Sequence, residues 1–191
     1  MSRVRPVLLA LCVAVLVAAG CGGQDPGGQA PTEPAAPPAT AGPPATSAAP
    51  EAPPAAVPET LDFTVRTVDG GELSGADLAG TPVAFWFWAA WCPRCAVAAS
   101  HVRAVQEEYA GQVHMVGVAG LSSGDDGMRD FVEMFQLDGF PHLADDEGVV
   151  WERFGVTTQE YFVILDAAGG IVHQGPLPED GLRDQLTALV G

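Results

Sequence analysis

Two cysteines separated by two residues are the side chains of this sequence best suited to chemistry. They lie in the run Cys92–Cys95, which reads CPRC, and the other two cysteines lie within the first 21 residues. A disulfide across so short a spacer restricts the unfolded chain little, so a purely structural bridge is a poor explanation. A zinc site needs about four ligands, and no second Cys-x-x-Cys or paired histidine spacing is present; His101 and His114 are isolated and expected on the surface. The pair therefore favours a redox-active dithiol.

The segments that flank the pair are expected to hold it at the start of a helix. Residues 82–88 are a continuous apolar run rich in aromatic residues, typical of a strand buried on both faces. An alanine-rich stretch follows to about residue 109, and Pro93 suits the first turn of a helix. The unpaired N–H groups and the helix dipole would stabilise a thiolate on Cys92, and Arg94 adds positive charge nearby. Cys92 is therefore expected to be the nucleophile, and Cys95 the resolving thiol.

Residues 87–95, with the sequence FWAAWCPRC, resemble the active site of the thioredoxin superfamily. The resemblance is strongest to its extracytoplasmic TlpA/DsbE-like branch, and within that branch to the exported actinobacterial DsbE/DsbF-like oxidoreductases. It spans about residues 61–190, with further similar segments at 73–80, 113–118, 145–156 and 162–166. It implies an α/β thioredoxin-like fold with a central mixed sheet flanked by helices. It also implies a redox disulfide between Cys92 and Cys95 and no need for a cofactor or metal.

The order of elements follows from the same segments. Strands are expected near 62–67, 83–88, 113–118, 161–166 and 170–174, and helices near 93–109, 126–136, 147–154 and 178–190. Phe131 and Phe135, four residues apart on one helix, are expected in the core. Asp125, Asp126 and Asp130 are expected to supply the N-cap and first turn of that helix, where the dipole favours acids. A calcium loop would need alternating ligands and a closing Glu at the twelfth position, which this segment lacks.

Two positions depart from the pattern of the superfamily. Its members place a cis-proline just before the strand expected at 161–166, and here Glu160 takes that position. A cis bond without proline costs about 2.5–4 kcal/mol, so a trans bond or a remodelled loop is expected. A carboxylate near the thiols would favour protonated Cys92, and the alternative is that Glu160 points to solvent. Thioredoxin itself has a buried aspartate in the central strand; here that position is Trp86, so the proton-handling carboxylate is missing.

The overall composition indicates one acidic domain on a tether. The 191 residues carry 24 acidic and 8 basic side chains, a formal charge of −16. Nucleic acid is therefore excluded as a partner, because binding it needs a basic face that displaces counterions. Residues 21–60 hold 11 of the 17 prolines and are expected to form an extended tether. The thioredoxin-like domain is expected at 61–191.

The first 20 residues are typical of an export signal of the lipoprotein type. Arg3 and Arg5 precede an uncharged stretch at 7–20 that is short for a bilayer span. Small residues lead directly to Cys21, as in a bacterial lipobox, which predicts that Cys21 carries a lipid. Ala18 stands where a lipobox usually has leucine, and ordinary cleavage with an incidental cysteine is the alternative.

These features predict an extracytoplasmic thiol–disulfide oxidoreductase that introduces or exchanges disulfides in exported proteins. It would be attached to the outer face of the cell membrane as a lipoprotein, or else secreted. Its partners would be cysteine-containing exported proteins and a membrane redox partner that resets the dithiol. Trp88 and Trp91 would pack around the dithiol, and a shallow apolar groove around Trp91 and residues 157–160 would bind substrate.

Two alternatives stay open. One is a reductase of the cytochrome c maturation type. The other is a non-enzymatic binding module in which the Cys92–Cys95 disulfide is inert. A copper-handling variant would need a His or Met that converges on the pair.

Overall fold

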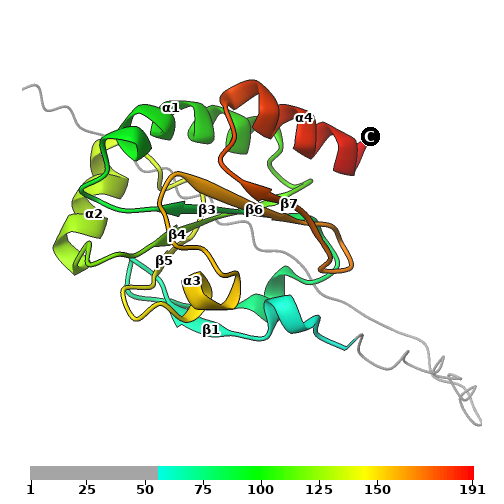
Figure 1. Ribbon diagram of the computed structural model, residues 1–191, viewed down its shortest axis with the longest axis horizontal. Coiled ribbons are helices and arrows are strands. Elements are labelled where there is room, and N and C mark those ends of the chain that lie inside the picture. The colour runs from blue at the N-terminus through cyan, green and yellow to red at the C-terminus, as the bar shows by residue number, and fades with distance from the viewer. Residues whose placement is uncertain (1–55) are drawn as a thin grey trace, which may run out of the picture. The chain divides into compact units, whose positions relative to one another are not determined.

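The computed structural model describes residues 56–191. The expected signal peptide at 1–20, the expected lipid site Cys21 and the tether up to residue 55 lie outside these residues. In the described part, a five-stranded sheet has the strand order β5-β4-β3-β6-β7, and β1 and β2 form a separate antiparallel pair (Figure 1). In chain order the elements are η1 (Glu59–Leu61), β1 (Thr64–Arg66), β2 (Glu72–Ser74), η2 (Gly75–Leu78), β3 (Val83–Trp88), α1 (Pro93–Glu108), β4 (His114–Ala119), α2 (Asp125–Met134), β5 (His142–Ala144), α3 (Val149–Arg153), β6 (Tyr161–Leu165), β7 (Ile171–Gly175) and α4 (Glu179–Val190).

β3 forms the centre of the sheet because all six of its residues are apolar and buried. It pairs parallel with β4 and antiparallel with β6, so the sheet is mixed, as predicted. Successive side chains of a strand point to opposite faces. Trp86 and Trp88 accordingly join one core cluster, and Phe85 and Phe87 join the other.

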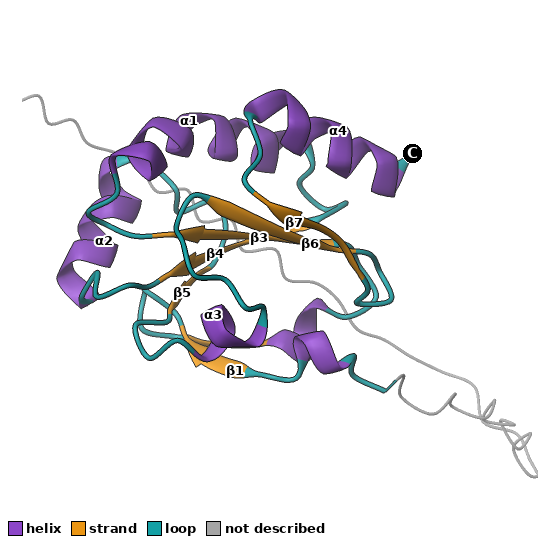
Figure 2. Cartoon of the chain, viewed as in Figure 1, coloured by secondary structure: helices purple, strands orange, loops and turns teal. Residues whose placement is uncertain are grey.

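The two faces of the sheet are covered by different elements. Helices α1 and α4 lie on one face, and α3 lies on the other with the β1–β2 pair (Figure 2). Every fully buried member of the two core clusters falls between Leu61 and Leu186. The described residues thus carry a two-sided core of their own and lie within one compact unit of the chain.

Several elements differ from the sequence prediction. β2 and β5 are not predicted at all, because three residues are too few to show a period of two. The strand expected at 62–67 is limited to 64–66. The helix expected at 126–136 ends at Met134, since Gln136 has a left-handed backbone with φ 54°. The helix expected at 147–154 is only the five residues of α3.

Individual side chains also test the prediction. Phe131 is buried and Phe135 packs against the same cluster, as predicted. The N-cap of α2 is Gly124, so the prediction of an aspartate cap is wrong; Asp125 and Asp126 lie in the first turn instead. His101 is half-buried rather than on the surface. Within residues 56–191, no helix combines the length and apolar character that crossing a bilayer requires.

Candidate active site

Cys92 is the N-cap of α1, directly after the loop that leaves β3. Its backbone is extended, with φ −87° and ψ 112°, and Pro93 opens the helix. Cys92 Sγ accepts a hydrogen bond from the Cys95 N–H at 3.1 Å. At this position the unpaired N–H groups and the helix dipole stabilise negative charge on sulfur. Both cysteines are free thiols, and the two residues are 2% and 0% exposed. The geometry suits nucleophilic attack by Cys92, with Cys95 one turn away.

The Cys95 thiol resists ionisation. Burial raises its pKa strongly, and the neighbouring Cys92 thiol and the negative charge of Glu160 raise that pKa further. Only a thiolate is an effective nucleophile. Cys95 therefore needs a group that takes its proton before it can attack a disulfide at Cys92.

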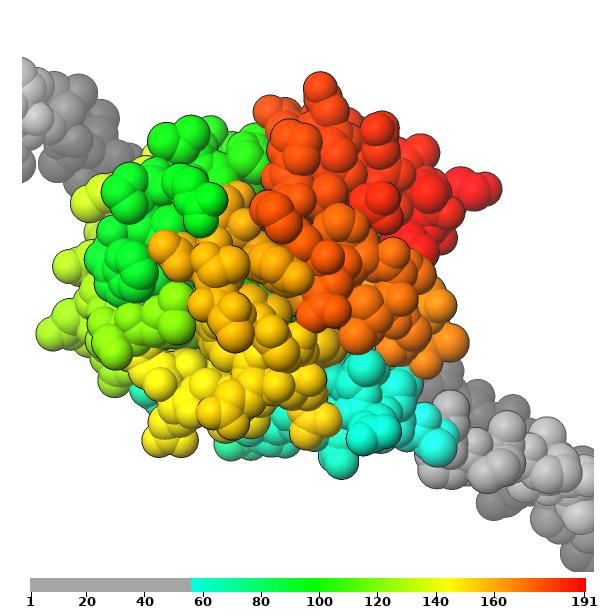
Figure 3. All heavy atoms as spheres, viewed as in Figure 1, coloured from blue at the N-terminus to red at the C-terminus, as the bar shows by residue number. Residues whose placement is uncertain are grey.

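Arg94 connects α1 to the loop before β6. Its Nη2 donates to the backbone oxygen of Gln159 at 3.3 Å, and the side chain is exposed. In the space-filling view, the amber segment that leads into β6 lies beside the green first turns of α1 (Figure 3). Burial raises the pKa of the Glu160 carboxyl group, and the charge of the guanidinium opposes that rise. Arg94 thus acts on the carboxylate next to the dithiol.

Glu160 points inward, so the alternative in which it faces solvent is wrong. Its N–H donates to the Phe87 carbonyl at 2.8 Å, and its Oε2 accepts from Trp86 Nε1 at 3.2 Å. Its backbone is left-handed, with φ 58°, which is the remodelled loop that the missing proline predicts. Burial raises the pKa of this carboxyl group; the hydrogen bond from Trp86 and the charge of Arg94 oppose that rise. A half-buried carboxylate therefore lies close enough to Cys95 for its charge to act on that thiol.

Trp86 holds that carboxylate in place. It is fully buried on β3, on the same face of the sheet as the two cysteines. Its ring stacks with Trp88 at a centroid distance of 6.0 Å. Trp88 belongs to the cluster that contains Cys92 and Cys95, as predicted. The strand position that carries a carboxylate in thioredoxin here carries an indole, and the indole binds a carboxylate from the loop before β6.

An apolar groove opens beside Cys92, with a volume of about 360 Å³. One wall contains Trp91, which is 55% exposed and donates through Nε1 to the Leu121 carbonyl at 2.9 Å. The other wall is α2, including Phe131 and Met134, the latter 72% exposed. The sequence predicts a groove against residues 157–160, whereas the structure places its second wall on α2.

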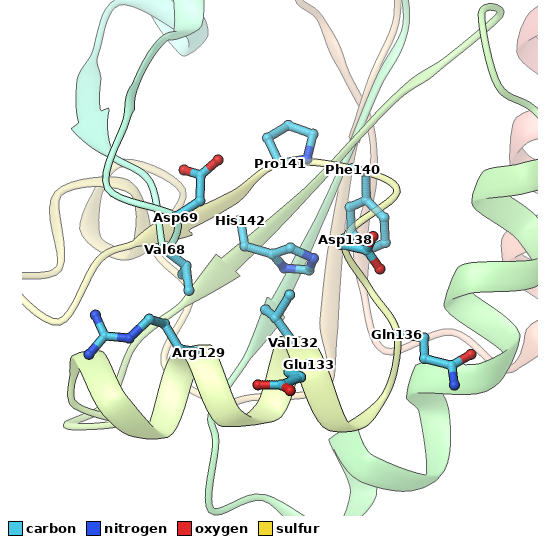
Figure 4. A pocket seen from close by; sticks show the side chains of 10 residues that line it. All are labelled: Val68, Asp69, Arg129, Val132, Glu133, Gln136, Asp138, Phe140, Pro141 and His142. Carbon is cyan, nitrogen blue, oxygen red and sulfur yellow. The ribbon is translucent and has the colours of Figure 1, made fainter. Parts of the chain in front are cut away.

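Two buried polar residues of the structure were missed in the sequence. His142 lies on β5, between α2 and β4, and borders a second hollow of about 500 Å³ (Figure 4). The lining of that hollow includes neither cysteine. Trp88 Nε1 donates to His142 Nδ1 at 3.2 Å, and His142 Nε2 lies 2.9 Å from the Leu137 carbonyl. An indole N–H can only donate, so Nδ1 accepts and the proton of the neutral ring is on Nε2.

Asp145 is the second buried residue that was missed. Its carboxylate accepts hydrogen bonds from the backbone N–H groups of Val149, Val150 and Trp151 at 2.7–3.0 Å. It therefore anchors the start of α3. In the described part of the chain, no three His, Cys, Asp or Glu side chains come together as metal ligands would.

The sequence of the chain matches the AhpC/TSA family over residues 57–178. The soluble secreted antigen MPT53 of Mycobacterium tuberculosis is 38% identical over 115 residues, which are 60% of this chain. That match covers 64% of the length of MPT53.

Two solved structures are similar as well. Mycobacterium tuberculosis DsbF, in mixed oxidised and reduced forms, has 38% identity and a TM-score of 0.66, covering 70% of this chain and 99% of DsbF. A secreted Mycobacterium tuberculosis disulfide oxidoreductase homologous to Escherichia coli DsbE has 33% identity and a TM-score of 0.62, covering 69% and 98%. The thioredoxin-like fold and the resemblance to DsbE/DsbF-like proteins are confirmed.

Proposed function

We propose that this chain, which belongs to the AhpC/TSA family, is a thiol–disulfide oxidoreductase of the DsbE/DsbF type that works through Cys92 and Cys95. The observation that supports this most directly is the position of Cys92. Its sulfur caps a helix and accepts the N–H of Cys95 at 3.1 Å. One of the similar solved structures is described as a secreted disulfide oxidoreductase.

The reaction is an exchange of disulfide bonds. In the oxidising direction, a substrate thiolate attacks Cys92 of the Cys92–Cys95 disulfide, and Cys95 leaves with a proton. A second substrate thiolate then attacks the substrate sulfur of the mixed disulfide, and Cys92 leaves as the thiolate that the helix terminus favours. Two electrons pass from the substrate dithiol to the cysteine pair. The reducing direction is the reverse.

The substrates we propose are cysteine-containing exported proteins. MPT53 and the DsbE homologue are described as secreted, and the groove beside Cys92 offers apolar walls to the residues next to a substrate cysteine. A signal at 1–20, a lipid on Cys21 and a proline-rich tether would keep the domain at the outer face of the membrane. A membrane redox partner would then restore the dithiol to its working state.

We propose the oxidising or exchanging direction, because the cap position of Cys92 favours the reduced, thiolate form. A second candidate, the reductase, is favoured by the carboxylate of Glu160. A negative charge beside Cys95 raises the pKa of its thiol. A less stable thiolate makes the reduced form of the cysteine pair less favourable, so the pair is a weaker oxidant.

The reduction potential of a fragment spanning residues 56–191 tests these candidates, since Cys92 and Cys95 are its only thiols. The fragment is equilibrated in glutathione or dithiothreitol buffers and followed by the fluorescence of Trp91. A potential of about −120 to −180 mV supports disulfide introduction, and about −270 mV supports the reductase. A pair that stays oxidised below about −300 mV would be a structural disulfide, and the enzymatic proposal would be wrong.

A further inference from the structure

The loop between β4 and α2, residues 120–124, is attached by two hydrogen bonds to the wall of the apolar groove that contains Trp91. Trp91 Nε1 donates to the Leu121 carbonyl at 2.9 Å. The Ala90 N–H donates to Ser123 Oγ at 2.9 Å. Ala90 and Trp91 both line the groove, so two adjacent residues of this wall depend on the position of the loop.

The Ser123 hydroxyl joins the two ends of this connection. Its Oγ accepts from the Ala90 N–H and donates to the Gly120 carbonyl at 2.6 Å, so its single proton is already used. The Gly120 N–H in turn donates to the carbonyl of Trp88, the last residue of β3, at 3.1 Å. Ser123 therefore fixes the segment between β3 and α1 against the 120–124 loop.

Asp146, between β5 and α3, holds the same loop from the other side. Its two carboxylate oxygens accept the N–H groups of Ser123 at 3.0 Å and of Gly124 at 2.8 Å. Gly124 is the N-cap of α2, and α2 forms the opposite wall of the groove. One carboxylate thus sets the position of Ser123 and of the start of α2 together.

The backbone of the loop shows that its surroundings impose its shape. Leu121 and Ser122 are both left-handed, with φ 58° and 60°, a conformation that is unfavourable for residues other than glycine. Such strain persists only where neighbouring groups hold it. At one end, Gly120 lies so close to the Trp151 ring that a Cβ would be 2.4 Å from Nε1. At the other end, the Asp146 carboxylate supplies the hold.

We propose that Ser123 and Asp146 are positioning residues that keep Trp91 and α2 at the spacing needed by a substrate with large apolar side chains beside its cysteine. This inference rests on the proposed oxidoreductase function and names the substrate class of that site. The two residues act through the groove walls rather than on the sulfur atoms. They therefore set the preference among substrates, whereas attack on Cys92 by a thiol with small polar neighbours does not depend on them.

The test compares two peptide thiols that differ only in the side chains beside the sulfur, Gly-Leu-Cys-Leu-Gly and Gly-Ser-Cys-Ser-Gly. The full chain carries Cys12→Ala and Cys21→Ala, which leaves Cys92 and Cys95 as its only cysteines. It is oxidised, mixed with a large excess of either peptide, and quenched with an alkylating agent. Mass spectrometry counts the cysteines that have been released from the disulfide. The rate at several peptide concentrations gives a second-order rate constant for each peptide, and their ratio is the preference for leucine.

Two variants and two matched controls are compared. Ser123→Ala removes the hydroxyl, and Asp146→Asn leaves only one oxygen for the two N–H groups. Ser122→Ala and Glu147→Gln make similar changes one residue away, at exposed positions. Urea unfolding of each protein shows that the assay is run on folded chains. Because Asp146 is exposed, its variant keeps the test decisive if Ser123→Ala does not fold.

The parent should prefer the leucine peptide. Ser123→Ala should lower that preference about tenfold, the factor that corresponds to the loss of a hydrogen bond, and Asp146→Asn should lower it by less. Rates with the serine peptide should stay within about twofold of the parent, and both controls should match the parent. The inference alone is overturned by an unchanged preference in both variants, by equal losses with both peptides, or by a parent without preference. A parent that reacts with neither peptide would contradict the proposed function itself.

Discussion

Lowering the pH from 7 to 4 is expected to remove about 3 kcal/mol of unfolding free energy through a single side chain, His142. The imidazole is buried between α2 and the sheet, and burial lowers its pKa from 6.5 to about 4. Its Nδ1 accepts from Trp88. Protonation would place a second donor against that indole N–H, so the hydrogen bond would be lost as the charge appears.

The magnitude follows from linkage. Because the folded pKa lies below the unfolded one, the stabilisation is fully present above pH 6.5 and is lost as the pH falls toward 4. Each pH unit in this interval costs about 1.36 kcal/mol. The interval between the two pKa values therefore gives about 3 kcal/mol, a large part of the stability of a domain this size.

Urea unfolding at a series of pH values measures this effect, with His142→Gln as the variant and His114→Gln as the control. His114 is exposed at the start of β4, so its substitution controls for the loss of an imidazole outside the core. The difference in unfolding free energy between the parent and His142→Gln should shrink by about 3 kcal/mol from pH 7 to 4. Parallel curves for the two proteins would refute the reasoning, as would an NMR titration of the parent in which the His142 ring protonates near pH 6.5.

Three further predictions concern single substitutions, each measured by urea unfolding. Gly117→Ala should destabilise the fold by about 3 kcal/mol or more, because a Cβ there would lie 2.0 Å from His142 Nδ1; a loss below 1 kcal/mol would mean that the ring moves freely. Asp145→Ala should cost about 3 kcal/mol, since three backbone N–H groups lose their acceptor, and Asp145→Asn, which keeps one oxygen, should cost less. Burial raises the pKa of Glu160 above 4.5, so the unfolding free energy should fall as the pH rises from 4.5 through the folded pKa. Glu160→Gln should lack that fall, and an unchanged curve would contradict the assigned environment.

The central elements could be predicted because their signals are local. Six consecutive apolar residues predict β3, and Pro93 at the first helical turn predicts where α1 begins. Together they place Cys92 at a helix terminus without any knowledge of the rest of the fold. β2 and β5 could not be found in this way, because strands of three residues form only when β1 and β4 are present to pair with them.

The two missed buried residues, Asp145 and His142, differ in how readily the sequence could have revealed them. Asp145 lies four residues before the first residue of α3, in a run of acids at 145–147, and acids near a helix start are favoured by its dipole. His142 offers no such signal. Its partner Trp88 is 54 residues away in sequence, and only the packing of α2 and β5 brings them together. The prediction of the second wall of the groove was wrong for the same reason, because only tertiary packing brings α2 next to Cys92.

Trp86 and Glu160 are two departures from the thioredoxin pattern that lie 74 residues apart in sequence. Each one alone removes a side chain that the pattern places at the active site. An indole replaces a carboxylate on the central strand, and a carboxylate replaces a proline before β6. A buried indole N–H needs an acceptor, and a half-buried carboxylate needs donors, because each is costly without a partner. The antiparallel pairing of β3 with β6 places Trp86 opposite Phe162, two residues beyond Glu160. Glu160 therefore supplies the acceptor that the Trp86 indole needs, and a carboxylate reaches the central strand from the loop before β6.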